Sequence, residues 1–426
     1  MFAAECYEHA LDIKDVPVAR NRLGEGLEAA DKAIRLAPNS NEAHVIRAAI
    51  LGALGRVQES LTALDEAGRL GASDMEIFHV RAVVRMDGDP AEALADCERV
   101  LAINPGHWAA RMNRCLLKLS IGDWRGWTDH EWRLKERGHP HHSFMKRAPQ
   151  WQDEPLAGRR LLVYSEQEDG ETFQFVRYLR LIENGGAQIT LTVHRAAICR
   201  LLAENFPGID VIAVGPLPAF DFHASLMSLP AILALESVPA TVPYLMADEE
   251  RVAKWRQRLG TEGFRVGIAW QWQGSPEYGC DQYRSIPLAA FAPLAAVPGV
   301  RLISVQARTG LAQLDALPPG MAVERLGEEI ENNPDFRDMA AVLASLDLII
   351  MLDTFSTHLA GALGRPVWLA TPRNPDWRWM RDREDSPWYP TLRLFRQETA
   401  GDWSGVFARM ARELAEVVAA RTRILF

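Results

Sequence analysis

The first third of the chain repeats one pattern of apolar and polar positions, with a period of roughly 34 residues that is typical of two-helix repeats. Four glycines mark the pattern at nearly equal spacing: Gly24, Gly55, Gly88 and Gly122. Two copies end alike, in AIRLAPNS (33–40) and VLAINPGH (100–107). Such a repeat predicts pairs of helices with a glycine in the turn between them. Because one pair cannot bury its apolar side alone, neighbouring pairs stack and leave a concave groove.

From residue 159 onward, short apolar runs alternate with helical patterns. The runs predict strands at 159–165, 187–193, 264–270, 301–306, 346–352 and 366–370. Helical patterns cover 172–186, 335–346 and 354–363. Strands that alternate with helices favour parallel sheets with right-handed crossovers. A charged segment at 247–263 divides this part, so we expect two Rossmann-like halves with a cleft between them.

These patterns predict an α + α/β protein in five parts. Residues 1–137 form the helical stack, and residues 138–158, rich in Pro, His and Gly, form a linker. The first α/β half covers 159–255 and the second covers 256–400. Residues 401–426 carry an amphipathic helix (402–423) with a packing role.

The composition excludes several classes of protein. Of 426 residues, 48% are apolar and 24% are charged, as in globular proteins and unlike disordered chains. The formal charge of −9 argues against a general nucleic-acid-binding surface. The sequence has no run of about 18 apolar residues, so no membrane span is expected, and its acidic start does not resemble a signal peptide. These features favour a cytoplasmic protein.

Metal binding is not expected from the cysteines and histidines. The five cysteines are scattered and never form a CxxC pair, which fits a reducing compartment. His139, His141 and His142 match no helical ligand spacing and have no cysteine partner. We therefore expect neither a metal nor another cofactor.

The strongest candidate for a ligand site is LDLIIMLDTFSTHLAGALGRPVWLA (346–370). A buried strand delivers Asp353 at its carboxyl end, followed by three hydroxyl side chains and a histidine in the next helix: Thr354, Ser356, Thr357 and His358. In open α/β sheets ligands bind at such strand ends, and a helix N-terminus favours anions such as a diphosphate. The alternative is a helix cap, made by Asp353 or Thr354, and a packed histidine.

A second candidate is the acidic loop in SEQEDGETFQFVRYL (165–179). It holds four carboxylates, of which the last stands at the start of the next helix: Glu166, Glu168, Asp169 and Glu171. A carboxylate facing the cleft can act as general base on an acceptor hydroxyl, and crowding can raise the pKa of one of the four. The alternative is that acidic residues simply favour the helix dipole.

Two further segments carry polar or aromatic side chains in loops. Arg284 and Ser285 precede a helix that Pro287 could open, where a cation can face phosphate charge; a solvated arginine is the alternative. The segment 372–397 concentrates Trp377, Trp379, Trp388 and Tyr389. Such aromatics either stack on sugars or bases, or anchor the loop to a core, and we favour anchoring for two of them.

Taken together, these strings resemble a known family. The N-terminal part is similar to tetratricopeptide repeats. Residues 149–400 resemble the glycosyltransferase family 9-like domain of bacterial tetratricopeptide-repeat proteins, related to ADP-heptose:lipopolysaccharide heptosyltransferases. The strings that carry this resemblance are PQWQDEPLAGRRLLVYSEQ (149–167), FDFHASLMSLP (220–230), VPYLMAD (242–248), RSIPL (284–288), DTFSTHLAGALGRPVW (353–368) and WRWMRDREDSPWYPTLRLFRQ (377–397). The resemblance implies a GT-B fold, whose C-terminal half holds a nucleotide sugar, and an inverting, metal-independent transferase.

The resemblance also implies roles for individual residues. Asp353, Thr354 and His358 would surround the diphosphate or the donor sugar, and Arg284 would face the phosphates. The family's EQGxGD motif corresponds to residues 166–171, where Glu166, Gln167 and Gly170 are retained. Glu168 replaces a glycine, and Glu171 replaces the aspartate expected to act as base.

Two functions remain open from the sequence. One is an inverting glycosyltransferase that moves a sugar from a nucleotide-sugar donor to a protein or peptide acceptor held by the repeats. The other is a catalytically inactive scaffold that binds proteins through its repeats, for which the altered acidic loop is the best support. A third function, heptose transfer to lipopolysaccharide, is less favoured because a lipid-linked acceptor does not need the repeats. Separately, tetratricopeptide stacks can pair, so a homodimer is possible.

Overall fold

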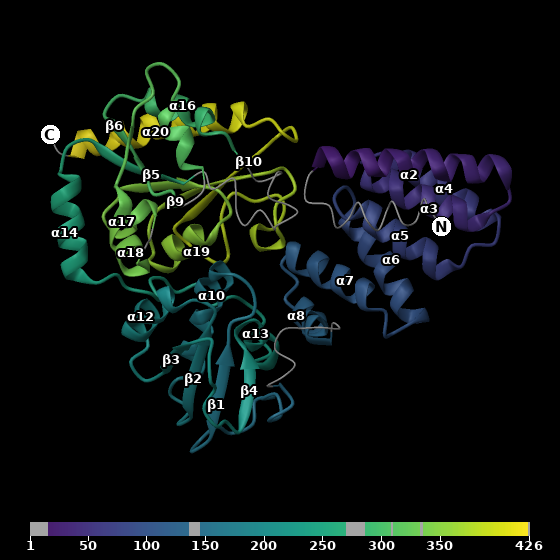
Figure 1. The fold of residues 1–426 in the computed structure, drawn as a ribbon, viewed down its shortest axis with the longest axis horizontal. Helices are drawn as coiled ribbons and strands as arrows, with labels where there is room; N and C mark the ends of the chain where they lie inside the picture. Colours follow the sequence, from purple (N-terminus) through teal and green to yellow (C-terminus); the bar gives the residue numbers. More distant parts are fainter. Residues whose placement is uncertain (1–15, 136–144, 270–285, 308–309, 333–334, 425–426) are drawn as a thin grey trace. The chain divides into compact units, whose positions relative to one another are not determined.

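The computed structural model describes residues 16–135, 145–269, 286–307, 310–332 and 335–424 (Figure 1). The chain separates into two compact units. The first holds the N-terminal helices together with the segment Asp376–Arg381, and the second holds both sheets. Within the described ranges, no helix has both the length and the apolar character that a membrane span requires.

The first unit is a succession of helices, each packed against the next. Its elements are α2 (Val16–Leu36), α3 (Asn41–Ala53), α4 (Val57–Arg69), α5 (Asp74–Arg85), α6 (Pro90–Ile103), α7 (Trp108–Ser120), α8 (Gly126–His130) and the 3-10 helix η1 (Glu131–Lys135). α3 also contacts α5, and α5 contacts α7, so alternate helices form a row. Buried alanines fill the crossings: Ala48, Ala63, Ala82, Ala93 and Ala110. This is the stack that the repeat period predicts.

Glycines occupy three of the four predicted turns. Gly55 and Gly122 have φ angles of 75° and 80°, a region that favours glycine, and Gly88 lies in the turn before α6. The turn predicted at Gly24 is wrong, because Gly24 lies inside α2. A single glycine costs a helix only about 1 kcal/mol relative to alanine. The apolar side of α2 outweighs this cost, since Leu23 packs in a buried cluster.

Buried carboxylates tie neighbouring helices of this unit together. Asp96 in α6 has an exposed fraction of 0% and bonds three guanidinium groups, those of Arg81 (2.6 Å), Arg85 (3.1 Å) and Arg99 (2.8 Å). Burial opposes ionisation of Asp96, but the hydrogen bond from Arg81 and the neighbouring cations hold its pKa below the ordinary value. The stack therefore depends on buried ion pairs as well as on apolar contacts.

The first sheet of the second unit is parallel, in the order β3-β2-β1-β4 (Figure 1). Its strands are β1 (Arg160–Tyr164), β2 (Gln188–Val193), β3 (Asp210–Ala213) and β4 (Phe222–Ser225), and its helices are α10 (Asp169–Phe175), α11 (Leu179–Ile182), α12 (Ala196–Asn205) and α13 (Leu229–Ile232), with the 3-10 helix η2 (Val176–Tyr178) after α10. β1 and β2 are the predicted strands. The helix predicted at 172–186 begins at Asp169 instead and is interrupted by η2.

Part of the stretch predicted as a linker pairs with this sheet. Gln150 forms a parallel bridge with His223 of β4, and the Trp151 N–H donates to the His223 carbonyl over 2.9 Å. Trp151 itself is buried. The segment therefore extends the edge of the sheet.

The second sheet is also parallel, in the order β10-β9-β8-β5-β6-β7. Its strands are β5 (Phe264–Ala269), β6 (Val300–Ser304), β7 (Val323–Glu324), β8 (Leu348–Met351), β9 (Val367–Thr371) and β10 (Leu392–Arg396), and its helices include α14 (Glu249–Leu259), α16 (Ala292–Ala295), α17 (Glu328–Glu331), α18 (Phe336–Ala344), α19 (Phe355–Ala362) and α20 (Ser404–Ile424). Counted from β5, this is the 3-2-1-4-5-6 order of doubly wound dinucleotide-binding folds, and the first sheet follows the same order over four strands. The predicted class, a helical repeat stack followed by the two Rossmann-like halves of a GT-B fold, is confirmed.

The C-terminal helix has the predicted packing role. Phe407, Met410 and Leu414 of α20 are fully buried in the core of the second sheet, where the rings of Phe407 and Phe291 lie 4.4 Å apart. The pattern of apolar runs does not predict β3, β4, β7 or β10. β7 is only two residues long, and β4 has the polar sequence FHAS, so neither shows a long apolar run.

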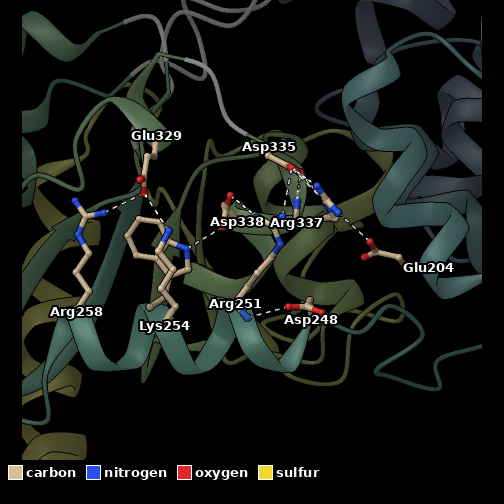
Figure 2. Close-up of polar contacts among 10 residues, drawn as sticks. Glu204, Asp248, Arg251, Lys254, Arg258, Glu329, Asp335, Arg337 and Asp338 are labelled. Atoms are coloured by element: carbon tan, nitrogen blue, oxygen red, sulfur yellow. Dashed lines mark hydrogen bonds and ion pairs between the residues drawn. The ribbon is translucent and has the colours of Figure 1, made fainter.

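Charged side chains join α14 to the second half (Figure 2). Arg251 Nη1 lies 2.6 Å from Asp338 Oδ2, and Arg258 Nη1 lies 3.2 Å from Glu329 Oε2. α14 therefore packs on α18, and the domain boundary expected at 255/256 falls inside this helix.

An ion pair links the two α/β halves. Arg337 at the start of α18 bonds Asp335 over 2.7 Å and reaches Glu204 of α12 over 3.1 Å (Figure 2). The backbone contributes as well, because the N–H groups of Tyr244 and Leu245 donate to the Ala362 carbonyl at the end of α19. The halves thus meet through α12 and α18 and through the crossing segment near Tyr244.

The segment Asp376–Arg381 packs with the helical unit, although the sequence analysis places it in the 256–400 half. The rings of Trp377 and Trp127 meet edge to face at 5.5 Å, and the Arg381 N–H donates to the Ser120 carbonyl. Trp379, Trp388 and Tyr389 are fully buried, and Trp377 is 9% exposed. All four aromatic side chains thus anchor their loops, whereas the sequence predicts anchoring for two of them.

Candidate functional site

The two α/β halves touch where α10 meets α19. Gly170 lies so close to α19 that a Cβ atom at this position would meet His358 Cδ2 at 3.1 Å and Phe355 Cα at 3.3 Å. The contact brings the acidic loop before α10 next to the first turns of α19. Two of the sequence-predicted segments, 165–171 and 353–358, are therefore neighbours in space.

α19 begins at the switch point of the second sheet. β5 and β8 are adjacent, but their crossover helices lie on opposite sides of the sheet, and ligands of doubly wound folds bind beyond the carboxyl ends of such strands. Asp353 and Thr354 lie at this point, separated from the end of β8 by Leu352 alone. The strand order alone thus singles out the same residues as the sequence motif.

The hydroxyl group of Thr354 is not used for helix capping. Thr354 is the N-cap residue of α19, but its side chain makes no cap hydrogen bond, and its buried Oγ1 has no hydrogen-bond partner among the residues that the structure describes. By contrast, Thr357 Oγ1 donates to the Leu352 carbonyl over 2.5 Å, and Ser356 is buried in the same turn. A helix cap made by Thr354 therefore does not account for its hydroxyl group.

Two more hydroxyl groups without partners lie at the carboxyl ends of neighbouring strands. Ser304 ends β6 and Thr371 ends β9, and both are fully buried. Within the described ranges, neither Ser304 Oγ nor Thr371 Oγ1 has a hydrogen-bond partner. Buried polar groups are normally satisfied, so unpaired ones mark strain, bound water or a ligand site. Together with the Thr354 hydroxyl, these two hydroxyl groups follow the edge of the second sheet at which its parallel strands end.

His358 is buried and held by its neighbours. Its Nδ1 lies 2.8 Å from the Tyr389 hydroxyl, and its Nε2 lies 3.9 Å from Asp353 Oδ1. The Tyr389 ring rests on Gly361, where a Cβ atom would come within 2.4 Å of the ring. The helix ends as predicted, at Gly364 with a φ angle of 65°. His358 is thus a packed histidine, as the alternative interpretation predicts. Its Nε2 atom faces the Asp353 carboxylate just beyond the end of β8.

Asp169 is the carboxylate with the most distinctive environment in the acidic loop. Its exposed fraction is 4%, and its Oδ2 lies 2.9 Å from Arg195 Nη1. Burial raises the pKa of the Asp169 carboxyl above its usual value, although the Arg195 guanidinium favours the charged form. A raised carboxylate pKa beside a candidate site is typical of a general base. The crowding of carboxylates in the sequence predicts one raised pKa in this loop, and the family resemblance points to Glu171 as the base.

The structure places the other predicted residues as follows. Glu166 and Glu171 are half-buried on either side of Asp169, and Gln167 and Glu168 are exposed. Arg284 and Ser285, like His139, His141 and His142, lie outside the described residues. Among the described residues, no group of three or more His, Cys, Asp or Glu side chains could hold a metal ion.

Arg177 and Tyr389 are the residues near this site that sequence reasoning missed. Arg177 stands in the apolar pattern FVRYL and is buried, which no motif indicated. Tyr389 was noted only as one of four loop aromatics. For Arg177, the sequence offers one signal of a special role: a charged residue stands inside an apolar helical pattern.

No family model matches the chain. Protein FlbA of Caulobacter vibrioides is 27% identical over 437 residues, which cover 94% of this chain and 71% of FlbA. The ADP-heptose LPS heptosyltransferase II of E. coli is 14% identical, with a TM-score of 0.43 over 62% of this chain and 99% of that one. A mutant O-GlcNAc transferase of Thermobaculum terrenum is 13% identical, with a TM-score of 0.30 over 99% of this chain and 92% of that one. The strand orders described above, rather than these likenesses, establish the fold.

Proposed function

We propose that the protein is a glycosyltransferase that binds a nucleotide-sugar donor at the start of α19. The observation that carries this proposal is the position of Asp353 and Thr354 at the switch point of the second sheet, with an unpaired Thr354 hydroxyl. A diphosphate would accept hydrogen bonds from this hydroxyl and from the backbone N–H groups of the first helical turn. The DTFSTHLAGALG motif supports the same assignment by resemblance.

The proposed reaction is an inverting transfer without metal. A carboxylate at the start of α10 removes the proton from the acceptor hydroxyl, the acceptor oxygen attacks the anomeric carbon, and the bond to the nucleotide diphosphate breaks. Glu171 is the base that the resemblance suggests. The buried Asp169 is the base that the local environment favours. Arg284, by resemblance, stabilises the departing phosphate.

The proposed acceptor is a protein or peptide, bound by the helical unit. Stacked helix pairs present an extended surface that suits a polypeptide. The alternative, a scaffold without catalysis, draws its support from Glu168, which stands where the family has a glycine.

Thermal unfolding with UDP, GDP, ADP, CMP and dTDP tests the donor site. A nucleotide that binds only the folded protein adds about 2.7 kcal/mol of stability at a hundredfold excess over its dissociation constant. We expect one nucleotide to raise Tm and to lose this effect in Asp353→Ala. If no nucleotide changes Tm, the donor site is refuted and the scaffold becomes the better account.

A further inference from the structure

Asp169 and Arg195 form an ion pair at the carboxyl edge of the first sheet. Asp169 begins α10 after β1, and Arg195 is the N-cap residue of α12 after β2. Because β1 and β2 are adjacent parallel strands, both residues reach the same edge of the sheet. Arg195 Nη1 lies 2.9 Å from Asp169 Oδ2. The pair thus joins two connections that the sheet topology brings together.

The two partners of this ion pair differ in burial. The Asp169 side chain is 6% exposed, whereas the Arg195 side chain is 41% exposed. Within the described ranges, Arg195 is also the one residue that donates a hydrogen bond to the Asp169 carboxylate, and it bonds Oδ2. A buried carboxylate stays charged only where a partner offsets its lost hydration. The charge state of Asp169 therefore depends on a side chain that solvent reaches.

Other groups around Asp169 act in both directions. Burial raises the pKa of the Asp169 carboxyl, and the Arg195 guanidinium opposes this effect. The neighbouring Glu168 raises the pKa further, while His194 lowers it. From α19, the ring of His358 packs against α10 at the residue after Asp169. Loss of the Arg195 charge would leave the influences that favour the neutral acid in excess.

We propose that Arg195 is a positioning residue that keeps Asp169 ionised as the general base of the transfer. The guanidinium occupies Oδ2, so Oδ1 is the oxygen that takes the proton from the acceptor hydroxyl. At the same time the acceptor oxygen bonds the anomeric carbon, and the bond to the nucleotide diphosphate breaks. This catalytic part rests on the proposed function. The coupling of the two charges does not, because it is a property of the free protein.

The first test is the titration of Asp169, followed by carbon-13 NMR of the full chain with labelled aspartate. Loss of one signal in Asp169→Asn assigns it. We expect Arg195→Met to move this titration to higher pH, because Met supplies a long side chain without a charge. Arg200→Met is the matched control, since Arg200 is exposed on the same helix and does not bond Asp169. An unchanged titration in Arg195→Met, or equal shifts in the two Met variants, would overturn the proposal.

Transfer measured against pH separates positioning from a purely structural role. We expect the acidic limb of the profile to move to higher pH in Arg195→Met, with transfer on that limb roughly tenfold slower and recovery above it. A loss of transfer that persists at every pH, together with a lower Tm, would contradict the positioning role. If the titration shifts as expected and no sugar is transferred by the unmodified protein, the coupling stands and only the proposed function fails.

Discussion

Gly170 of α10 lies so close to the imidazole ring of His358 in α19 that an added Cβ atom would stand 3.1 Å from the ring. This single contact brings the acidic loop of the first half to the helix that starts at the switch point of the second half. The proposed base and the proposed donor site are neighbours because of it.

Gly170→Ala should therefore disturb the site. The added methyl group would meet the backbone of Phe355 as well as the His358 ring, and such overpacking costs about 1–3 kcal/mol. We expect a lower Tm and a smaller nucleotide-induced shift. Gly24→Ala is the control, since nothing lies within 4 Å of a Cβ atom there and alanine is the better helix former. Equal effects of the two substitutions would contradict the close contact.

Asp169→Asn should abolish transfer while stabilising the protein. Burial raises the folded-state pKa of Asp169 above its unfolded value, so the folded state binds more protons between the two values. Stability therefore falls as the pH rises through that interval, and at neutral pH the buried charge is unfavourable. Asn removes the charge and loses only a bond to the half-exposed Arg195. Glu171→Gln is the competing variant, and transfer assays with both decide which carboxylate is the base.

Thr354→Val and Thr357→Val should have opposite signatures. The Thr354 hydroxyl bonds no group in the described part of the chain, so its loss should leave Tm unchanged but weaken nucleotide binding by up to about tenfold. The Thr357 hydroxyl bonds the Leu352 carbonyl, so its loss should lower the free energy of unfolding by about 1 kcal/mol. Calorimetric melting with and without the nucleotide separates the two effects. A Thr354→Val protein that binds as well as the original would remove Thr354 from the site.

Arg177→Met should destabilise the second unit strongly. It leaves three backbone carbonyls and the Tyr244 hydroxyl without their donor, at a cost of about 3 kcal/mol or more in total. Arg177→Lys should rescue little, because an ammonium group cannot reach acceptors that a guanidinium fork bonds at once. Urea unfolding measures both. A Met variant as stable as the original would show that the buried cation is dispensable.

Acid should weaken the helical unit through Asp96. Because its folded-state pKa is lowered, Asp96 contributes stability above its unfolded pKa and loses that contribution as the pH falls through the folded value. Asp96→Asn should therefore destabilise the unit at neutral pH and reduce the acid-induced loss of stability. Asp31→Asn, which changes a more exposed ion pair with Arg47, should have a small effect. Circular dichroism between pH 7 and pH 3 measures the difference.

The sequence by itself determined the classes of structure and the neighbourhood of the site. The repeat of the N-terminal helices, and the alternation of apolar runs with helical patterns after it, report how each segment buries its own apolar side. This is a local property. Local patterns therefore predict the helical stack and the strands β1, β2, β5, β6, β8 and β9. They also predict that a helix begins near Thr354, which is the N-cap residue of α19. Short or polar strands such as β4 and β7 were not, because their neighbours in the sheet supply the stabilisation.

Only the tertiary structure decided which side chains act together. Asp169 and Glu171 look alike in the sequence, and they differ because one is buried beside Arg195. Tyr389 bonds His358, and Arg177 donates to the Trp388 carbonyl, although each pair is far apart along the chain. Burial, hydrogen bonding and pKa depend on distances across the fold, which the order of residues along the chain does not contain.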